Sequence, residues 1–179
     1  MRPERAMRRR LLAVLAGASV LQLAGCAFKF PEPVFTRTGR FNVRIKTDGG
    51  FETLPGRFRF ERWPGDRRVL VLMNPMRMVL ARITLLPGRA ELEAGGEKNS
   101  SADAEALLAS ALGLELPVTT LAGWLEGAPV DAAALRGWRL SNEAKWPDGA
   151  LRRLDAEHDD PPVKLRLFCD PIEHASQPL

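Results

Sequence analysis

The chain has almost no net charge of its own once its first 25 residues are set aside. The full sequence of 179 residues carries 26 lysines and arginines against 22 acidic residues, a formal net charge of +4. Residues 1–25 contain five arginines and one glutamate, so the remainder holds 21 basic and 21 acidic residues. No nucleic-acid binding is expected, because that function normally requires a basic surface.

The sequence also lacks a long apolar run. Residues 11–23 are mostly apolar, but as a helix they would span roughly 20 Å, whereas a bilayer core is about 30 Å thick. A permanent membrane-spanning helix is therefore not expected here. There is no G-x-S-x-G, no HExxH, no phosphate-binding glycine loop and no paired-cysteine metal motif, so the sequence gives no support to the corresponding enzyme classes.

The first 25 residues have the order of a secretory signal peptide. A basic head ends with Arg8-Arg9-Arg10, the apolar run follows, and small residues precede Cys26. The stretch Leu23-Ala24-Gly25-Cys26 resembles the lipobox of bacterial lipoproteins. That resemblance implies cleavage before Cys26, a thioether-linked diacylglycerol on its sulfur and a third acyl chain on the new amino terminus. Three chains would anchor the protein durably. The residue after the cysteine is Ala27 and not aspartate, which by resemblance to the sorting rule of enteric bacteria implies the outer membrane. The alternative is an ordinary signal peptide with an incidental cysteine.

The second cysteine, Cys169, would have no partner in the chain once Cys26 carries lipid. It ends an alternating stretch in which Val163, Leu165 and Leu167 share its face. We expect a buried, inert thiol, because a reactive cysteine needs a base and a polar environment.

One cluster of possible metal ligands is present, His158-Asp159-Asp160. Its place in an expected turn favours a solvated turn over a metal site. We therefore expect no metal, no cofactor other than the lipid on Cys26, and no catalytic residue.

The rest of the chain reads as one domain. Residues 26–38 are expected to form a short extended tether after the lipid site, residues 39–170 a domain, and residues 171–179 a tail. Alternating apolar residues and turn residues between them predict strands at 39–46, 56–63, 69–73, 78–86, 90–94, 138–144, 151–157 and 162–170. Sequential strands with tight turns favour an antiparallel meander.

Two amphipathic helices are expected between these strands. The first begins after Ser100 and Ser101, which we expect to cap it, and ends at Gly113. The second follows Pro117 and ends near Gly127.

These helices can cover the apolar face of the sheet. The pattern leaves open whether the interior is packed core or a ligand cavity. The candidate cavity residues are Phe41, Phe58, Phe60, Leu72, Ile83, Trp124 and Leu165.

The turn Asn74-Pro75-Met76-Arg77 joins two apolar strands. Asparagine at the first position and proline at the second favour a type I turn, which puts Met76 at the tip. Met76 is then either an ordinary exposed apolar residue or one that inserts into lipid or a partner.

Several stretches, in order, resemble the LolB family of outer-membrane lipoprotein receptors: the lipobox, GRFNVR, GRFRFERW, LMNPM…LARITLLPGRAEL, DAEALLASALGLELPVTTLAGWLEGAP, GWRL and VKLRL. The resemblance covers most of residues 39–168. It implies a mainly β (α+β) fold, an unclosed antiparallel half-barrel with helices covering an apolar cavity.

The same resemblance implies a function. The protein would be a monomer that accepts lipoproteins from the periplasmic carrier LolA, binds their acyl chains and inserts them into outer-membrane lipid. Pro75 and Met76 would belong to the membrane-insertion loop. The alternative is a structural or assembly lipoprotein that binds a protein partner; a solidly packed interior would favour it.

Overall fold

The computed structural model describes residues 31–112, 116–129, 135 and 137–172. Residues 32–179 form one compact unit, separate from residues 1–31, and this unit contains every strand and helix named below. Cys26, the expected helix stop Gly113 and the tail after residue 172 lie outside the described residues. Among the helices that are described, none has the length and apolar character needed to cross a membrane.

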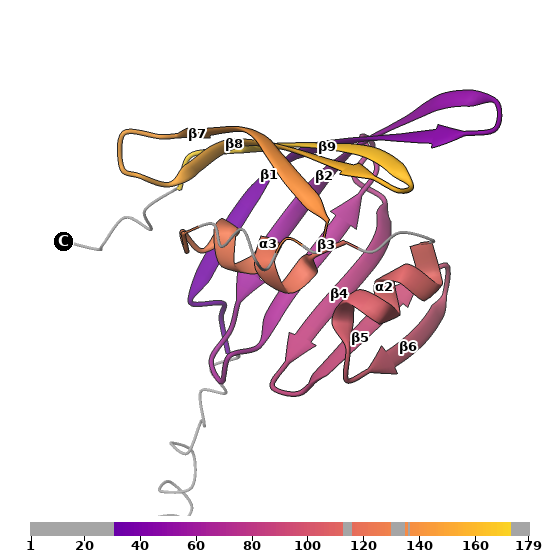
Figure 1. Ribbon diagram of the computed structural model, residues 1–179. Helices are drawn as coiled ribbons and strands as arrows, with labels where there is room; N and C mark the ends of the chain where they lie inside the picture. Colours follow the sequence, from indigo (N-terminus) through magenta and orange to yellow (C-terminus); the bar gives the residue numbers. More distant parts are fainter. Residues whose placement is uncertain (1–30, 113–115, 130–134, 136, 173–179) are drawn as a thin grey trace, which may run out of the picture. The chain divides into compact units, whose positions relative to one another are not determined.

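Nine antiparallel strands form a single sheet in the described part of the chain (Figure 1). They are β1 (Phe35–Thr47), β2 (Gly50–Arg62), β3 (Arg68–Met73), β4 (Val79–Leu86), β5 (Arg89–Ala94), β6 (Glu97–Ser101), β7 (Trp138–Lys145), β8 (Leu151–Asp159) and β9 (Pro162–Cys169). Their order across the sheet is β6-β5-β4-β3-β2-β1-β9-β8-β7. The chain thus forms a meander from β1 to β6 and then returns to the other side of β1.

The sheet does not close, because β6 and β7 are edge strands with one paired neighbour each. Between them in the sequence lie α2 (Ala104–Leu112) and α3 (Val118–Leu125), which lie over one face of the sheet (Figure 1). Alternate strand residues on that face are buried, as in β9, where every second residue is buried. The expected mainly β, unclosed half-barrel covered by helices is confirmed.

Two Gly-Arg-Phe triplets lie opposite each other on β1 and β2. The register pairs Gly39 with Phe58, Arg40 with Arg57, and Phe41 with Gly56. A Cβ added at Gly39 would come within 2.7 Å of the Phe58 ring, and one at Gly56 would meet the Phe41 ring. Each glycine therefore leaves the space that the opposite phenylalanine fills on the core side.

The chain before α2 differs from our expectation. Ser100 and Ser101 do not cap the helix; they belong to β6 and pair with β5. Asp103 provides the cap, since its Oδ1 accepts a hydrogen bond of 3.0 Å from the backbone N–H of Ala106. Strand β6 was missed because it has no apolar alternation, as its sequence EKNSS lies at a solvated edge.

The first strand also begins earlier than predicted. Residues 35–38, which we had assigned to the tether, pair with β2. Arg37 in this stretch is only 1 % exposed, a position that a solvated tether would not provide.

Candidate functional site

An apolar cavity lies between the sheet and the two helices. Its volume is about 60 Å³. Four neighbouring strands β1 to β4, together with β9, form its wall, while α2, α3 and the segment before α3 cover it. All thirteen residues around it are apolar: Phe41, Val43, Phe58, Leu70, Leu72, Ile83, Leu108, Leu116, Val118, Leu121, Leu125, Leu165 and Leu167.

Five of the seven residues proposed for a cavity lie in this lining, namely Phe41, Phe58, Leu72, Ile83 and Leu165. The other two, Phe60 and Trp124, are buried in the core but do not border the cavity. The helical part of the lining was not among our candidates. Leu121 and Leu125 are apolar and lie four positions apart in the predicted second helix, which places them on one face, so the signal was present in the sequence.

The cavity in this state is small. A volume of this size holds a few water molecules and is too small for a long acyl chain. A long chain can therefore enter only if the helices move away from the sheet. The interior is neither solidly packed nor already open.

Two polar contacts hold the helices in place: one joins the end of α3 to the sheet, and the other joins α2 to α3. Arg68 Nε on β3 donates a hydrogen bond of 2.8 Å to Glu126 Oε1, directly after α3, and this bond raises the pKa of Arg68. On α2, Glu105 Oε1 accepts a hydrogen bond of 3.2 Å from the backbone N–H of Thr119 on α3. The Arg68–Glu126 ion pair is partly exposed and contributes at most about 1 kcal/mol, so it can open at low cost. Glu105 is buried, and a hydrogen bond to a charged group of this kind contributes about 1.5–3 kcal/mol.

The turn at Met76 has the predicted form. The backbone N–H of Arg77 donates a hydrogen bond of 2.9 Å to the carbonyl of Asn74, and Asn74 Oδ1 accepts one from Met78 N–H. Pro75 is the second residue of this turn and Met76 the third. The Met76 side chain is 83 % exposed, so it makes no contribution to the core.

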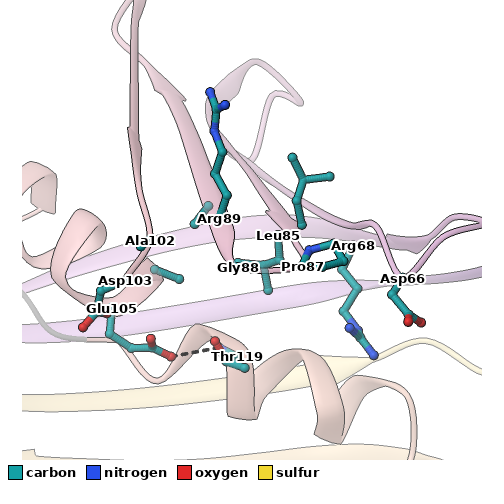
Figure 2. A pocket seen from close by; sticks show the side chains of 13 residues that line it. Asp66, Arg68, Leu85, Pro87, Gly88, Arg89, Ala102, Asp103, Glu105 and Thr119 are labelled. Atoms are coloured by element: carbon teal, nitrogen blue, oxygen red, sulfur yellow. Dashed lines mark hydrogen bonds between the residues drawn. The ribbon is translucent and has the colours of Figure 1, made fainter.

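A larger hollow lies elsewhere, between the β4–β5 turn and the start of α2 (Figure 2). It has a volume of about 650 Å³ and several charged residues around it, among them Asp66, Arg68, Arg89 and Glu105. Such a lining does not suit a bare acyl chain, because desolvating charged groups is costly. The apolar cavity is therefore the better candidate for a lipid.

The predicted buried thiol is found at Cys169, which is 3 % exposed. Burial raises the pKa of this thiol, although the nearby Arg37 guanidinium acts in the opposite direction. The thiol therefore stays protonated at neutral pH and lacks the character of a nucleophile.

The His158-Asp159-Asp160 cluster does not form a common site. Asp159 accepts two hydrogen bonds from Arg139, and these bonds lower the pKa of its carboxyl group. The His158 ring packs against Trp138 at a centroid distance of 5.3 Å. Nowhere in the described ranges do three His, Cys, Asp or Glu side chains gather so that they could hold a metal ion.

Comparisons with known proteins point in one direction. Residues 34–158 match the family model described as "Outer membrane lipoprotein LolB". The chain is 30 % identical to the outer-membrane lipoprotein LolB of Cupriavidus necator, over 92 % of this chain and 98 % of that protein. It is 38 % identical to the LolB of Bordetella pertussis, over 69 % of this chain and 62 % of that protein.

A third relative, the LolB of Azoarcus sp. strain BH72, is 29 % identical over 92 % of this chain and 96 % of that protein. The matched region contains β1 to β7, both helices and almost all of β8. It therefore includes the helices that cover the cavity and the Met76 turn. The outer membrane, expected from the lipobox, is the location that these relatives carry in their names. The chain belongs to the LolB family of outer-membrane lipoproteins.

Proposed function

We propose that this protein receives lipoproteins from the soluble carrier LolA at the periplasmic side of the outer membrane and inserts them into that membrane. The observation that carries the proposal is the wholly apolar cavity beneath two helices, in a chain of the LolB family. The role is one of binding and transfer rather than catalysis.

The physical need for such a receptor follows from the cargo. Exposing three long acyl chains to water would cost on the order of 40 kcal/mol, at roughly 0.8 kcal/mol per methylene. A lipoprotein must therefore pass from one apolar site to the next without leaving them. No energy source is needed if each site binds the chains more tightly than the last.

In this scheme the helices act as a cover that the cargo displaces. The acyl chains replace the contacts that Leu108, Leu121 and Leu125 make with the sheet wall. Because the helices cover the sheet and leave a cavity of only about 60 Å³, the apolar surface is protected from water until cargo arrives. The Arg68–Glu126 and Glu105–Thr119 contacts hold the closed arrangement.

Release into the bilayer would use the Met76 turn. Met76 cannot gain burial energy from its own core, and burying a side chain of this size in lipid yields about 1.5–3 kcal/mol. That contact would bring the cavity to the bilayer surface, so that the chains move from protein to lipid. The lipid on Cys26 would keep the receptor at the membrane.

The test separates acceptance from release. We expect Met76→Glu to accept a labelled lipoprotein from LolA as well as the unaltered protein does, but to release it into liposomes at least tenfold more slowly, because a carboxylate does not enter the apolar layer. The matched control is Val34→Glu. Val34 is also apolar and 59 % exposed, but it lies beside Arg62 at the opposite end of β2.

Both proteins should remain folded, because neither side chain contributes to the core. Normal release by Met76→Glu would reject the insertion role of the turn. Failure of the unaltered protein to take cargo from LolA would reject the receptor function itself.

A further inference from the structure

Two arginines face each other at one end of the sheet. Arg40 on β1 and Arg57 on β2 are direct cross-strand partners. Both are exposed, and each is preceded by a buried glycine and followed by a phenylalanine on the core side. Side chains in such a pair lie about 5 Å apart at their Cβ atoms, and like charges in this position are destabilising. The matched Gly-Arg-Phe triplets fix this arrangement, because each phenylalanine ring lies over the opposite glycine.

These charges are not compensated. Neither Arg40 nor Arg57 forms an ion pair with any residue in the parts of the chain that the structure describes. Other arginines on the sheet do have such partners: Arg59 contacts Glu61 at 2.6 Å and Arg82 contacts Glu93 at 3.8 Å. An uncompensated pair of cations has an electrostatic cost that an anion would remove.

The two arginines border one hollow. Its volume is about 400 Å³, and its other lining residues are neutral: Phe41, Asn42, Pro55, Gly56, Pro75 and Phe168. The lining therefore combines two guanidinium groups and one amide with apolar surface, and it contains no carboxylate. Arginine pairs bind phosphate well, because each guanidinium presents a planar set of donors.

The hollow lies directly beside the most apolar part of the surface. Pro75, one of its lining residues, precedes Met76 in the exposed turn. Of the eight large apolar residues that are exposed in the described chain, six lie near the β1–β2 and β3–β4 turns: Phe51, Leu54, Met76, Met78, Val79 and Leu80. The β1–β2 hairpin also extends past β3 (Figure 1), because β3 pairs with β2 only from Arg57 onward.

We infer that Arg40 and Arg57 form a docking site for the phosphate group of an anionic phospholipid. Apolar side chains of the β3–β4 turn would enter the acyl layer, while the arginine pair lies level with the headgroups. The inference rests on the proposed function, since it assigns the surface through which the receptor meets the bilayer. It adds a charge-selective step to insertion by the Met76 turn.

The test is vesicle binding by residues 32–179, the compact unit that holds every described strand, helix and core residue. Its partition is measured by sedimentation with vesicles of phosphatidylcholine, with or without phosphatidylglycerol. Each basic residue near an anionic surface strengthens binding about fivefold. We therefore expect the double variant Arg40→Gln/Arg57→Gln to bind the phosphatidylglycerol vesicles roughly 30-fold more weakly, with unchanged binding to phosphatidylcholine.

Two controls separate this site from general charge. Arg67→Gln/Arg89→Gln removes the same charge at the opposite end of the sheet, in the β2–β3 and β4–β5 regions, and should bind like the unaltered unit. Arg40→Lys/Arg57→Lys keeps the charge but loses the planar guanidinium donors, so it should bind the phosphatidylglycerol vesicles more weakly than the unaltered unit and more tightly than the glutamine variant. Circular dichroism of each variant checks the fold.

Equal binding of the glutamine variant and the unaltered unit would overturn the inference, as would equal binding to both kinds of vesicle. Displacement of the unit from the phosphatidylglycerol vesicles by inorganic phosphate at constant ionic strength would also overturn it, because the hollow would then be a site for a small free anion. The assay contains neither cargo nor LolA, so its failure leaves the receptor function standing and separately testable.

Discussion

A single amide in the cavity wall should weaken acyl-chain binding without unfolding the protein. Leu72 on β3 is half-buried and lines the cavity, and it lies on the sheet, so movement of the helices cannot carry it away. In Leu72→Gln, the amide faces the acyl chain without a hydrogen-bond partner, which costs about 1–3 kcal/mol. Binding should therefore weaken roughly 5- to 140-fold.

The assay is a fluorescence titration with a fatty acid that becomes emissive in an apolar site. The matched control is Leu140→Gln. Leu140 on β7 is also a half-buried strand leucine that packs against the core, but it does not line the cavity. Both substitutions should lower the unfolding free energy by about 1 kcal/mol, because both leucines are only partly buried. Equal probe affinity of the two variants would refute the assignment of the cavity as the acyl-chain site.

Two further predictions concern the buried guanidinium of Arg37 on β1 and the buried thiol of Cys169 on β9. Arg37 donates one hydrogen bond to the carbonyl of Leu151, while its Nε and Nη1 have no hydrogen-bond partner among the described residues. Because an incompletely paired buried charge is unfavourable, Arg37→Met should unfold in urea at a concentration close to that of the unaltered protein. Arg37→Ala leaves a cavity, so its free energy of unfolding should be lower than that of the unaltered protein by about 2 kcal/mol or more. A similarly large loss of unfolding free energy in both variants would contradict this account of the charge. Cys169 should resist thiol reagents at neutral pH until the protein unfolds. Since its pKa is raised above 9.0 in the folded protein, the stability it contributes is present below pH 9 and decreases above it, which a comparison of urea unfolding with Cys169→Ala can measure.

Much of the fold was predictable, because its strands show period-two alternation and its turns contain glycine, proline and asparagine. The β9 strand, with Val163, Leu165, Leu167 and Cys169 on one face, is an example. The turn at Met76 was also predictable, since Asn74 and Pro75 favour the observed hydrogen bonds. The strand β6 was not, because an edge strand solvated on both faces has no apolar pattern to read.

The site was predictable only in part. Strand residues that face the helices can be recognised by alternation, but alternation does not separate Phe58, which lines the cavity, from Phe60, which does not. That distinction depends on where the helices lie, and helix position is set by contacts between residues far apart in sequence, such as Arg68 and Glu126.

The arginine pair was hidden for a related reason. Each Gly-Arg-Phe triplet is visible in the sequence, but their antiparallel register, which places Arg40 opposite Arg57, appears only once β1 and β2 are paired.

The most direct measurement places a photoreactive phenylalanine analogue at Leu121, in the helical cover of the cavity, and offers the protein a lipoprotein with labelled acyl chains bound to LolA. Irradiation should join the labelled acyl chains to position 121, whereas the same analogue at position 140 should remain unlabelled. Transfer of the cargo without any acyl chain joined at position 121, or equal labelling at both positions, would contradict the claim that the cavity holds the lipid.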